Sequence, residues 1–382
     1  MRVVIAGGGT GGHTSAGLAV STALLERGAD LHWIGSRGGI EARRVPEAGI
    51  PFHVIQTGKL RRYWDWQNIP DVFLRMPAGV AQSWRLLRRL HPSLLFATGG
   101  FVSLPPALAA RALGIPIVVH EQTSIPGLAN RIVARFACRI ALTFAPSGNA
   151  VPLERSIVTG NPVRPELLGG SRDAACRRFS LDPAMPIVYV TGGAQGSHKI
   201  NRTVGEVLPD LLADCQVIHQ CGDNAVTGDR AWLTGRAASL PQSLARRYAV
   251  KAYVGGELRD VYAAADLIVG RSGAGTVNEC LHLGKAAIYV PLPGTSGDEQ
   301  TVNARLVEAA GGGVLLPQDS LTPRRLLDAV KRLVADPAAL QAMGRAAKGL
   351  AVPDAAQRIA QLVCEVAAPD RNRPSTESLK PA

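Results

Sequence analysis

The sequence feature that most constrains the fold is a unit in which an apolar run, a glycine-rich turn and a helical pattern follow one another. In its first copy, the glycine turn at residues 7–12 joins the apolar run 3–6 to a helix predicted over residues 15–26. Such a turn binds anions such as phosphate, because its backbone N–H groups are exposed, the helix dipole is positive there and no Cβ blocks the approach. Three further turns of this kind occur, at residues 98–103, 192–197 and 271–276.

Strand-like apolar runs alternate with helical patterns in two stretches of the chain, which predicts parallel sheets covered by helices on both faces. In the first stretch the predicted strands are residues 3–6, 31–34, 52–55, 94–97, 115–120 and 140–143. In the second stretch they are residues 186–191, 216–220, 250–254, 267–269, 286–290 and 313–316. Because 382 residues suffice for two domains, we predict an α/β protein with two Rossmann-like domains facing a cleft. Ligand is expected in that cleft, at the carboxyl ends of both sets of strands.

Residues 161–165 interrupt the alternation and separate the two predicted domains, which we place at residues 1–163 and 164–352. A helix is predicted over residues 355–367, and it could pack on either domain. Residues 369–382 are polar and contain proline, which predicts a disordered tail.

The net charge of +12 favours anionic partners, which include nucleic acid, phosphate-bearing ligands and an acidic membrane surface. The six cysteines are scattered and form no C-x-x-C pair, as is typical of a reduced cytosolic protein. The first apolar run follows Met1 so closely that no signal peptide is expected there. Because no apolar run approaches the roughly 20 residues of a membrane-spanning helix, we expect a protein that touches a membrane without crossing it.

The first glycine turn matches the dinucleotide fingerprint G-x-G-x-x-G, but neighbouring signals for such a cofactor are missing. No acidic residue ends the predicted strand 31–34, and no Lys-Ser or Lys-Thr pair follows the turn as in a Walker loop. We therefore expect a different bound diphosphate and no cofactor. No metal is predicted either, since D-x-D, H-x-x-x-H and cysteine clusters are missing from the sequence. His13 begins the following helix, where it either accepts a proton or pairs with phosphate, or only caps the helix.

Polar residues accompany the other turns. The pair at 120–121, His-Glu, ends a predicted strand, where it either serves the site or hydrogen-bonds neighbouring loops. Thr276 and Glu279 have the spacing of a helix capping box. Alternatively, Glu279 binds the two hydroxyls of a ribose, and Arg271 neutralises phosphate. The amides of the polar segment 298–304 either read a sugar or belong to ordinary surface.

A basic and aromatic segment covers residues 58–90. Its cationic and aromatic side chains are Lys59, Arg61, Arg62, Tyr63, Trp64, Trp66, Phe73, Arg75, Trp84, Arg85, Arg88 and Arg89. This mixture suits single-stranded nucleic acid and equally a membrane interface. Over residues 80–90, where Val80, Trp84 and Leu87 are predicted to share one helix face, an ordinary amphipathic helix with a solvated basic side is the alternative.

Six motifs occur in order: Gly-Gly-Thr-Gly-Gly-His at 8–13, Gly-Gly-Phe-Val-Ser at 99–103, His-Glu-Gln at 120–122, Gly-Asn-Pro-Val-Arg at 160–164, Gly-Gly-Ala-Gln-Gly at 192–196 and Arg-Ser-Gly-Ala-Gly-Thr-Val-Asn-Glu at 271–279. As an ordered set, which is more specific than any one motif, they resemble the MurG family of bacterial glycosyltransferases from the first strand to about residue 360. The resemblance implies a B-type glycosyltransferase fold, in which two Rossmann-like domains surround a cleft and the last helix crosses back to the first domain.

The resemblance also implies an inverting hexosyltransferase of peptidoglycan synthesis, with roles in cell shape and cell division. Such an enzyme moves N-acetylglucosamine from UDP-N-acetylglucosamine to the 4-hydroxyl of undecaprenyl-pyrophosphoryl-N-acetylmuramoyl-pentapeptide (lipid I), forming lipid II. It would work as a peripheral protein on the cytoplasmic face of the cell membrane. Segment 58–90 would then dock on anionic lipid, and nucleic acid would have no role.

By the same resemblance, the second domain holds the donor. The donor contacts would be Arg164, Ala194, Ala274, Gly275, Thr276, Val277, Asn278, Glu279 and Gln300, with Val254 at the uracil. The residues facing the reacting sugar and the acceptor diphosphate would be Thr10, Gly11 and Gly12, with Thr123 nearby. Three residues depart from the family pattern. Ala194 occupies a position where the family usually has serine, so the contact of that hydroxyl with phosphate is lost. Thr123 occupies the position of an asparagine, and Phe101 that of a frequent tyrosine.

The expected mechanism is a single in-line displacement by the acceptor 4-hydroxyl, with UDP as the leaving group. His13 is the candidate base, while turn amides, a helix dipole and Arg164 or Arg271 would balance the diphosphate charge. The alternatives are a B-type glycosyltransferase with another lipid or small-molecule acceptor, a UDP-sugar epimerase, and an RNA-binding protein. Four ordered glycine turns argue against the last, because nucleic-acid binding needs basic grooves rather than anion sites of this kind.

Overall fold

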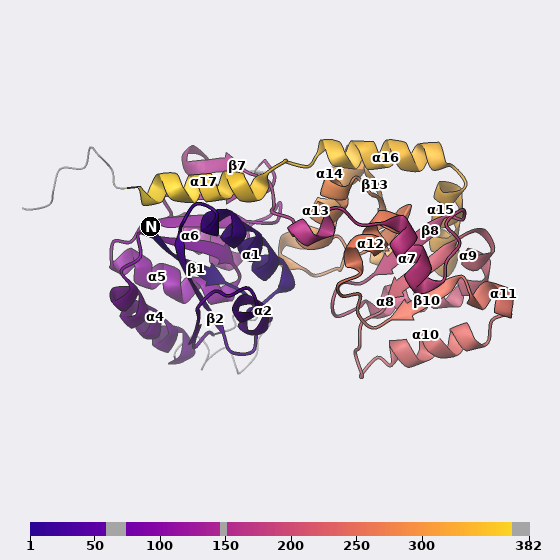
Figure 1. Ribbon diagram of the computed structural model, residues 1–382, viewed down its shortest axis with the longest axis horizontal. Helices are drawn as coiled ribbons and strands as arrows, with labels where there is room; N and C mark the ends of the chain where they lie inside the picture. The colour runs from indigo at the N-terminus through magenta and orange to yellow at the C-terminus, as the bar shows by residue number, and fades with distance from the viewer. Residues whose placement is uncertain (59–73, 146–150, 369–382) are drawn as a thin grey trace, which may run out of the picture.

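The computed structural model describes residues 1–58, 74–145 and 151–368 and contains two α/β domains, at the left and the right of Figure 1. Each domain is built on its own sheet, and the described strands pair in parallel throughout. The predicted fold class, two Rossmann-like domains, is therefore confirmed. The tail predicted over residues 369–382 lies outside the described residues.

The first sheet has seven strands in the order β3-β2-β1-β4-β5-β6-β7, and the second has six in the order β10-β9-β8-β11-β12-β13. The strands of the first sheet are β1 (Arg2–Gly7), β2 (Asp30–Ser36), β3 (Phe52–Ile55), β4 (Leu94–Gly99), β5 (Ile117–Glu121), β6 (Arg139–Leu142) and β7 (Ser156–Val158). Those of the second are β8 (Ile187–Thr191), β9 (Gln216–Gln220), β10 (Tyr248–Lys251), β11 (Leu267–Gly270), β12 (Ala286–Tyr289) and β13 (Gly313–Leu315).

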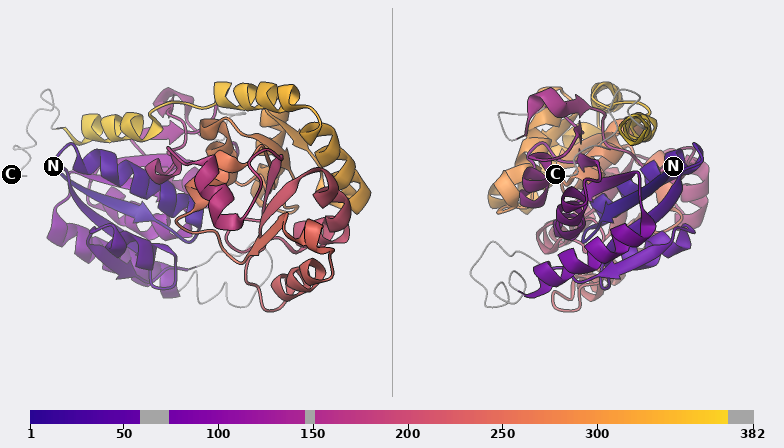
Figure 2. Two further views of the ribbon diagram at one scale, coloured as in Figure 1. Left: turned by 45° about the vertical axis from the view of Figure 1, so that its right-hand side comes forward. Right: turned by 90° about the vertical axis from the view of Figure 1, so that its left-hand side faces the viewer.

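Helices cover both faces of the sheets (Figures 1 and 2). In the first domain they are α1 (Gly11–Leu25), α2 (Glu41–Glu47), α4 (Met76–Leu90), α5 (Leu104–Ala112) and α6 (Leu128–Ala134). The following helices are α7 (Arg172–Phe179), α8 (His198–Glu206), α9 (Leu208–Asp214), α10 (Asp229–Ala238), α11 (Gln242–Ala245), α12 (Leu258–Ala264), α13 (Ala274–Leu283), α14 (Glu299–Ala309), α15 (Pro323–Val334), α16 (Pro337–Gly349) and α17 (Ala355–Ala367). The short 3-10 turns are η2 (Phe101–Ser103), η3 (Leu153–Arg155), η4 (Pro165–Leu167), η5 (Ser296–Asp298) and η6 (Gln318–Ser320).

The four glycine turns meet at the switch points of the two sheets. Strand order reverses between β1 and β4 in the first sheet, and between β8 and β11 in the second. These are the four strands that the glycine turns follow. A doubly wound sheet binds its ligand at such a switch point, because the loops from adjacent strands diverge there and leave a crevice. The topology thus brings the four turns to the carboxyl edges of both sheets.

Several elements differ from their sequence-based predictions. Helix α1 begins at Gly11 rather than at residue 15, because Thr10 is the N-cap and its Oγ1 accepts from the backbone N of His13 at 3.5 Å. Strand β7 was not predicted, since it has only three residues and two of them are exposed. Strand β10 ends at Lys251 rather than at residue 254.

Helix α4 also corrects a prediction about segment 58–90. Leu87 and Leu90 are buried, whereas Trp84 is 37% exposed, so Trp84 does not share the buried face. Buried positions at 83, 87 and 90 follow the helical period and leave Trp84 at the edge of the apolar face. The part of the segment with Trp64 and Trp66 lies outside the described residues.

Helix α17 packs on the first domain, as Figure 1 shows in yellow. Its residues Ile359 and Val363 are fully buried in one cluster with Val3 and Ile5 of β1 and Val20 of α1. The chain therefore crosses from the first sheet to the second and returns. None of the described helices is both long and apolar enough to cross a lipid bilayer.

Candidate active site

Two adjoining pockets lie between the domains, at the edge where the glycine turns meet. The first has a volume of about 470 Å³, and its walls include the first two glycine turns and the segment from Glu121 to Asn130. The second has a volume of about 190 Å³ and lies among α1, the third glycine turn and α13. Residues 273–276 line the first pocket from the second domain, so both domains contribute to both pockets.

His13 lies in the first turn of α1 and lines the first pocket. Its Nδ1 lies 3.0 Å from the carbonyl oxygen of Thr98. A carbonyl only accepts hydrogen bonds, so Nδ1 carries the proton and Nε2 of the neutral ring keeps a lone pair. Burial lowers the pKa of His13, although the charge of Glu121 and the bond to Thr98 act in the opposite direction. The imidazole is therefore neutral near pH 7 and able to accept a proton at Nε2.

Glu121 organises the loop that forms one wall of the first pocket. Its carboxylate accepts from the backbone N and the hydroxyl of Thr123, both at 2.9 Å, from Gly127 N at 3.2 Å and from Asn130 Nδ2 at 2.8 Å. Thr123 Oγ1 also lies 2.7 Å from the carbonyl oxygen of Ile125, so its hydroxyl is committed within the loop. Of the two roles open for this glutamate, the observed contacts show the loop-holding one.

The same loop connects the two domains. Ser124 Oγ donates to Oδ1 of Asn303 on α14 at 2.9 Å, and Asn303 Nδ2 donates to the Ser272 carbonyl oxygen at 3.1 Å. Asn303 is fully buried and Ser124 nearly so. This pair could not be predicted, since nothing local in the sequence marks two polar residues 179 positions apart as partners.

Glu41 holds the first glycine turn, although no motif in the sequence marks it. This fully buried carboxylate accepts from Gly9 N at 3.1 Å and from the backbone N and hydroxyl of Ser36 at 3.2 and 2.6 Å. A Cβ built on Gly8 would lie 2.2 Å from Glu41 Cδ, so only glycine fits there. Glu41 lies on α2 rather than at the end of β2, and its carboxylate binds Gly9 and Ser36, so it is not the strand-end acidic residue of a dinucleotide site.

The second pocket contains a charge pair that links two distant segments. Arg164 Nη2 donates to Glu279 Oε1 at 2.9 Å, and the Tyr262 hydroxyl donates to Glu279 Oε2 at 2.7 Å. The capping-box interpretation of Glu279 is therefore wrong. Helix α13 begins at Ala274, with Gly273 as the N-cap, so Thr276 lies inside the first turn and Glu279 in the second.

Two residues that were predicted to contact the ligand have side chains that bind other parts of their own domain. Arg271 Nη1 donates to the carbonyl oxygens of Val290 and Pro291, each at 3.0 Å, and Nη2 donates to Gln318 at 2.7 Å. Burial lowers the pKa of Arg271 to about 10. Because this guanidinium is engaged within its own domain, the interpretation of Arg271 as a phosphate ligand is wrong. Gln300 Oε1 accepts from the backbone N of Leu292 at 3.0 Å; its role in reading a sugar stays a prediction.

The other predicted site residues gather at the two pockets, with two exceptions. Those lining the first pocket are Thr10, Gly12, Thr123, Ala274, Gly275 and Thr276. Those lining the second are Gly11, Gly12, Arg164, Ala194, Val254, Gly275, Thr276 and Glu279. The exceptions are Val277, which is fully buried in the core, and Asn278, whose Nδ2 donates to the Ala274 carbonyl oxygen at 2.8 Å.

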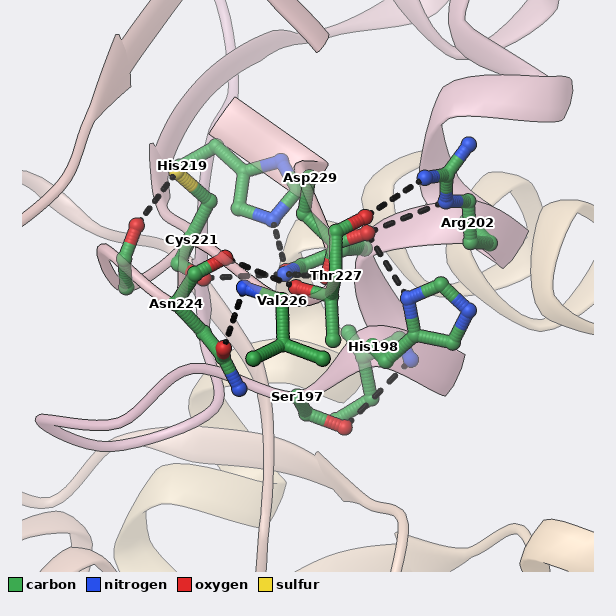
Figure 3. A network of polar contacts seen from close by, with 12 residues as sticks. Ser197, His198, Arg202, His219, Cys221, Asn224, Val226, Thr227 and Asp229 are labelled. Carbon is green, nitrogen blue, oxygen red and sulfur yellow. Dashed lines mark hydrogen bonds and ion pairs between the residues drawn. The ribbon is translucent and has the colours of Figure 1, made fainter. Parts of the chain in front are cut away.

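A polar network fixes the helix that follows the third glycine turn. Figure 3 shows His198 and Arg202 of α8 converging on the buried carboxylate of Asp229, at 2.8 and 3.0 Å. Asn201 Nδ2 donates to the same carboxylate at 3.0 Å, and its Oδ1 accepts from His219 Nε2 at 3.0 Å. Burial lowers the pKa of His219 to about 3, so this ring stays neutral. The network fixes α8, and the turn before this helix contributes Gly193 and Ala194 to the second pocket.

The close approach of the first two glycine turns gives a testable prediction. Gly100 has φ +79° and ψ 163°, and a Cβ built on it would lie 2.4 Å from the Gly8 carbonyl oxygen. We expect Gly100→Ala to lower the free energy of unfolding in urea by roughly 3 kcal/mol, from backbone strain and overpacking together. The control is Gly114→Ala, which has φ +68° but no atom within 4 Å of the built Cβ, and should cost about 1 kcal/mol. Equal losses in both variants would show that the approach of the turns does not matter.

Comparisons with known proteins identify relatives along almost the whole chain. Residues 3–142 match the glycosyltransferase family 28 N-terminal domain, and residues 187–359 match the glycosyltransferase family 28 C-terminal domain. A curated protein of Nocardioides sp. is 40% identical over 375 residues, which cover 96% of this chain and 98% of that protein. Its name is UDP-N-acetylglucosamine--N-acetylmuramyl-(pentapeptide) pyrophosphoryl-undecaprenol N-acetylglucosamine transferase.

Solved structures agree with these matches. The crystal structure of Acinetobacter baumannii MurG superimposes with a TM-score of 0.71 at 27% identity, covering 95% of this chain and 99% of that one. A UDP-GlcNAc 2-epimerase from Neisseria meningitidis, bound to UDP-GlcNAc, superimposes with a TM-score of 0.67 over 96% of this chain and 100% of that one. At 14% identity, the second likeness concerns the fold alone.

Proposed function

This chain belongs to the MurG family of family 28 glycosyltransferases, and on that premise we propose that it transfers N-acetylglucosamine from UDP-N-acetylglucosamine to the 4-hydroxyl of lipid I, forming lipid II. One observation carries the proposal: the two pockets meet, since Gly12, Gly275 and Thr276 line both of them. A donor in the second pocket and an acceptor in the first would bring their reacting atoms together between the N-termini of α1 and α13.

The polar groups of the second pocket suit a UDP-sugar donor. Glu279 is oriented by Arg164 and Tyr262, so its carboxylate oxygens are placed to accept from the two hydroxyls of a ribose. Val254, at the same pocket, would contact the uracil. Ala194, in the turn before α8, would leave the diphosphate to backbone N–H groups and to the helix dipoles of α8 and α13.

The acceptor fits the first pocket because the lining is both apolar and polar. Its apolar side chains are Met76, Phe101, Leu104, Leu128 and Ile132, which suit a lipid-linked substrate. Its polar groups include His13 and Glu121, and it shares Gly12, Gly275 and Thr276 with the second pocket. The reacting hydroxyl would lie near these polar groups.

The chemistry is then a single displacement with inversion. Nε2 of His13 takes the proton of the acceptor 4-hydroxyl while the oxygen attacks the anomeric carbon on the face opposite UDP. The bond from that carbon to the β-phosphate oxygen breaks, and its electron pair leaves with UDP. The charge of Glu121 favours the imidazolium that forms on His13, and the N-terminus of α13 faces the charge that develops on the diphosphate.

The experiment that tests this function measures UDP release from UDP-N-acetylglucosamine, with and without a lipid-pyrophosphoryl-N-acetylmuramoyl-pentapeptide analogue. We expect release only with the acceptor, together with a disaccharide product. Release with a different acceptor would assign another B-type transferase activity. Interconversion of the UDP-sugar without acceptor would assign an epimerase, and both results would overturn the proposal.

The enzyme would work on the cytoplasmic face of the cell membrane, where α4 provides a docking surface. Trp84 is exposed, and the Arg88 guanidinium lies 4.7 Å from the centre of its ring. Arg85 and Arg89 lie on the same helix. Aromatic and basic side chains together suit the interface of an anionic bilayer. Segment 59–73, with Arg61, Trp64 and Trp66, lies outside the described residues.

A vesicle assay checks this docking surface. We expect the triple substitution Trp84→Ala, Arg85→Ala and Arg88→Ala to weaken binding to anionic vesicles roughly 10- to 100-fold, because each basic residue contributes about 1 kcal/mol near such a surface. The control removes two exposed arginines of α15, Arg324 and Arg332, and should change binding less than threefold. The same assay with Arg61, Trp64 and Trp66 replaced by alanine covers the remaining segment. Undiminished vesicle binding in both sets of variants would refute docking through residues 58–90.

A further inference from the structure

Helix α2 of the first domain brings an arginine to the pocket that we assign to the nucleotide. Arg44 lines the second pocket, which Glu279 and Ala194 line from the second domain. It also lines an adjoining cavity of about 280 Å³ that shares Ser15 and Leu18 with that pocket. The side chain of Arg44 is 33% exposed, whereas that of its neighbour Arg43 is 75% exposed and lines neither space.

Among the charged residues that line the second pocket, Arg44 is the cation that no close ion pair neutralises. The charged residues that line this pocket are Arg44, Arg164 and Glu279. Arg164 and Glu279 neutralise each other at 2.9 Å. In the described part of the chain, Arg44 has one ion pair, with Glu47, and the distance of 3.9 Å from Nε to Oε2 makes it a weak one. A diphosphate bound here would therefore face one side-chain cation that is free to turn towards it.

The position of Arg44 is coupled to the first glycine turn. Glu41, three residues earlier on α2, is fully buried and accepts the backbone hydrogen bonds of Gly9 and Ser36. These bonds tie α2 to the turn that lines both pockets. Arg44 therefore lies on a helix that is hydrogen-bonded to the turn carrying Gly11 and Gly12, at the N-terminus of α1, which has no acidic residue in its first turn.

We propose that Arg44 is a phosphate-binding residue of the donor site, which contacts the nucleotide diphosphate from the first domain, opposite the domain that holds the nucleoside. Its guanidinium fork matches two phosphate oxygens. Because the contact spans the cleft, donor binding and the approach of the two domains favour each other. The inference rests on the proposed function, since it takes the ligand of the second pocket to be a nucleoside diphosphate.

The test compares UDP with uridine, by titration calorimetry on the full chain. We expect Arg44→Ala to weaken UDP binding at least tenfold and to change uridine binding less than twofold, while Arg44→Lys gives an intermediate loss. Arg43→Ala, the matched neighbour that shares the partner Glu47, should keep UDP binding within twofold. Glu47→Ala should leave UDP binding unchanged or make it tighter, because it releases Arg44.

Each contrary result has its own meaning. Unchanged UDP binding in Arg44→Ala overturns the inference, and so does an equal loss for UDP and uridine, which would place Arg44 at the nucleoside. A loss in Glu47→Ala as large as that in Arg44→Ala overturns it too, since the ion pair on α2 would then be what matters. If the unaltered protein binds no UDP, the donor assignment fails and the inference falls with it. Equal midpoints of thermal unfolding for Arg43→Ala and Arg44→Ala would show that the loss of UDP binding in Arg44→Ala does not come from impaired folding.

Discussion

Replacement of His13 by alanine is expected to lower kcat for transfer by roughly 10²- to 10⁴-fold, the range that a general base contributes. The ring is held by its Nδ1–H bond to the Thr98 carbonyl oxygen, and His13 lines the first pocket. Alanine removes the proton acceptor without disturbing Arg164 or Glu279 in the second pocket. The affinity for UDP should therefore stay within threefold, and the loss should appear in kcat.

The pH dependence of kcat checks the same role. Because burial lowers the pKa of His13 below its usual 6.5, the neutral base persists as the medium becomes mildly acidic. We expect kcat to be flat above pH 7, to keep more than half of its value at pH 6.5, and to fall as the pH drops through the lowered pKa. His91→Asn is the control, since this residue ends α4 with a left-handed φ of 46° that asparagine tolerates. A kcat for His13→Ala within threefold of the unaltered protein, or a midpoint above pH 6.5, would assign the base elsewhere.

The glycine turns could be predicted because their signal is local. Each strand, turn and helix is contiguous in the sequence, and the rule for parallel sheets brings their ends to one edge. The helix start at Gly11 was missed by four residues, since a helix beginning with two glycines has weak intrinsic propensity and depends here on the Thr10 cap and on packing. Local patterns thus place the elements, and their exact ends follow from contacts.

The contacts inside the site depend on tertiary structure and could not be predicted. Thr276 and Glu279 have the spacing of a capping box, yet Glu279 pairs with Arg164, 115 residues away. Arg271 lies beside a turn predicted to bind phosphate, yet its guanidinium donates hydrogen bonds to three acceptors of its own domain. Glu41 carries no motif at all. In each case a long polar side chain chooses among partners that only the packed fold brings within reach.

The pair formed by Arg164 and Glu279 supports the second large prediction. The two side chains are 23% and 17% exposed, and Arg164 Nε has no hydrogen-bond partner among the described residues. Removing the carboxylate would leave a largely buried guanidinium without its counter-charge, and such a loss costs a few kcal/mol. It would also free Tyr262 and remove the proposed acceptor for the ribose hydroxyls.

Glu279→Ala should therefore weaken UDP binding by roughly 10²-fold and lower the free energy of unfolding by about 2 kcal/mol. Titration calorimetry with UDP and urea unfolding measure the two effects separately. Two matched variants divide the contributions: Tyr262→Phe removes one donor to the carboxylate and keeps the charge pair, while Glu279→Gln keeps an acceptor and removes the charge. Both should lose less UDP affinity than Glu279→Ala, and Glu279→Gln should lose more stability than Tyr262→Phe, because it alone leaves Arg164 uncompensated. If Glu279→Ala bound UDP as tightly as the unaltered protein, the ribose would have to lie outside the second pocket. The contacts of Glu279 with Arg164 and Tyr262 would then serve only the fold.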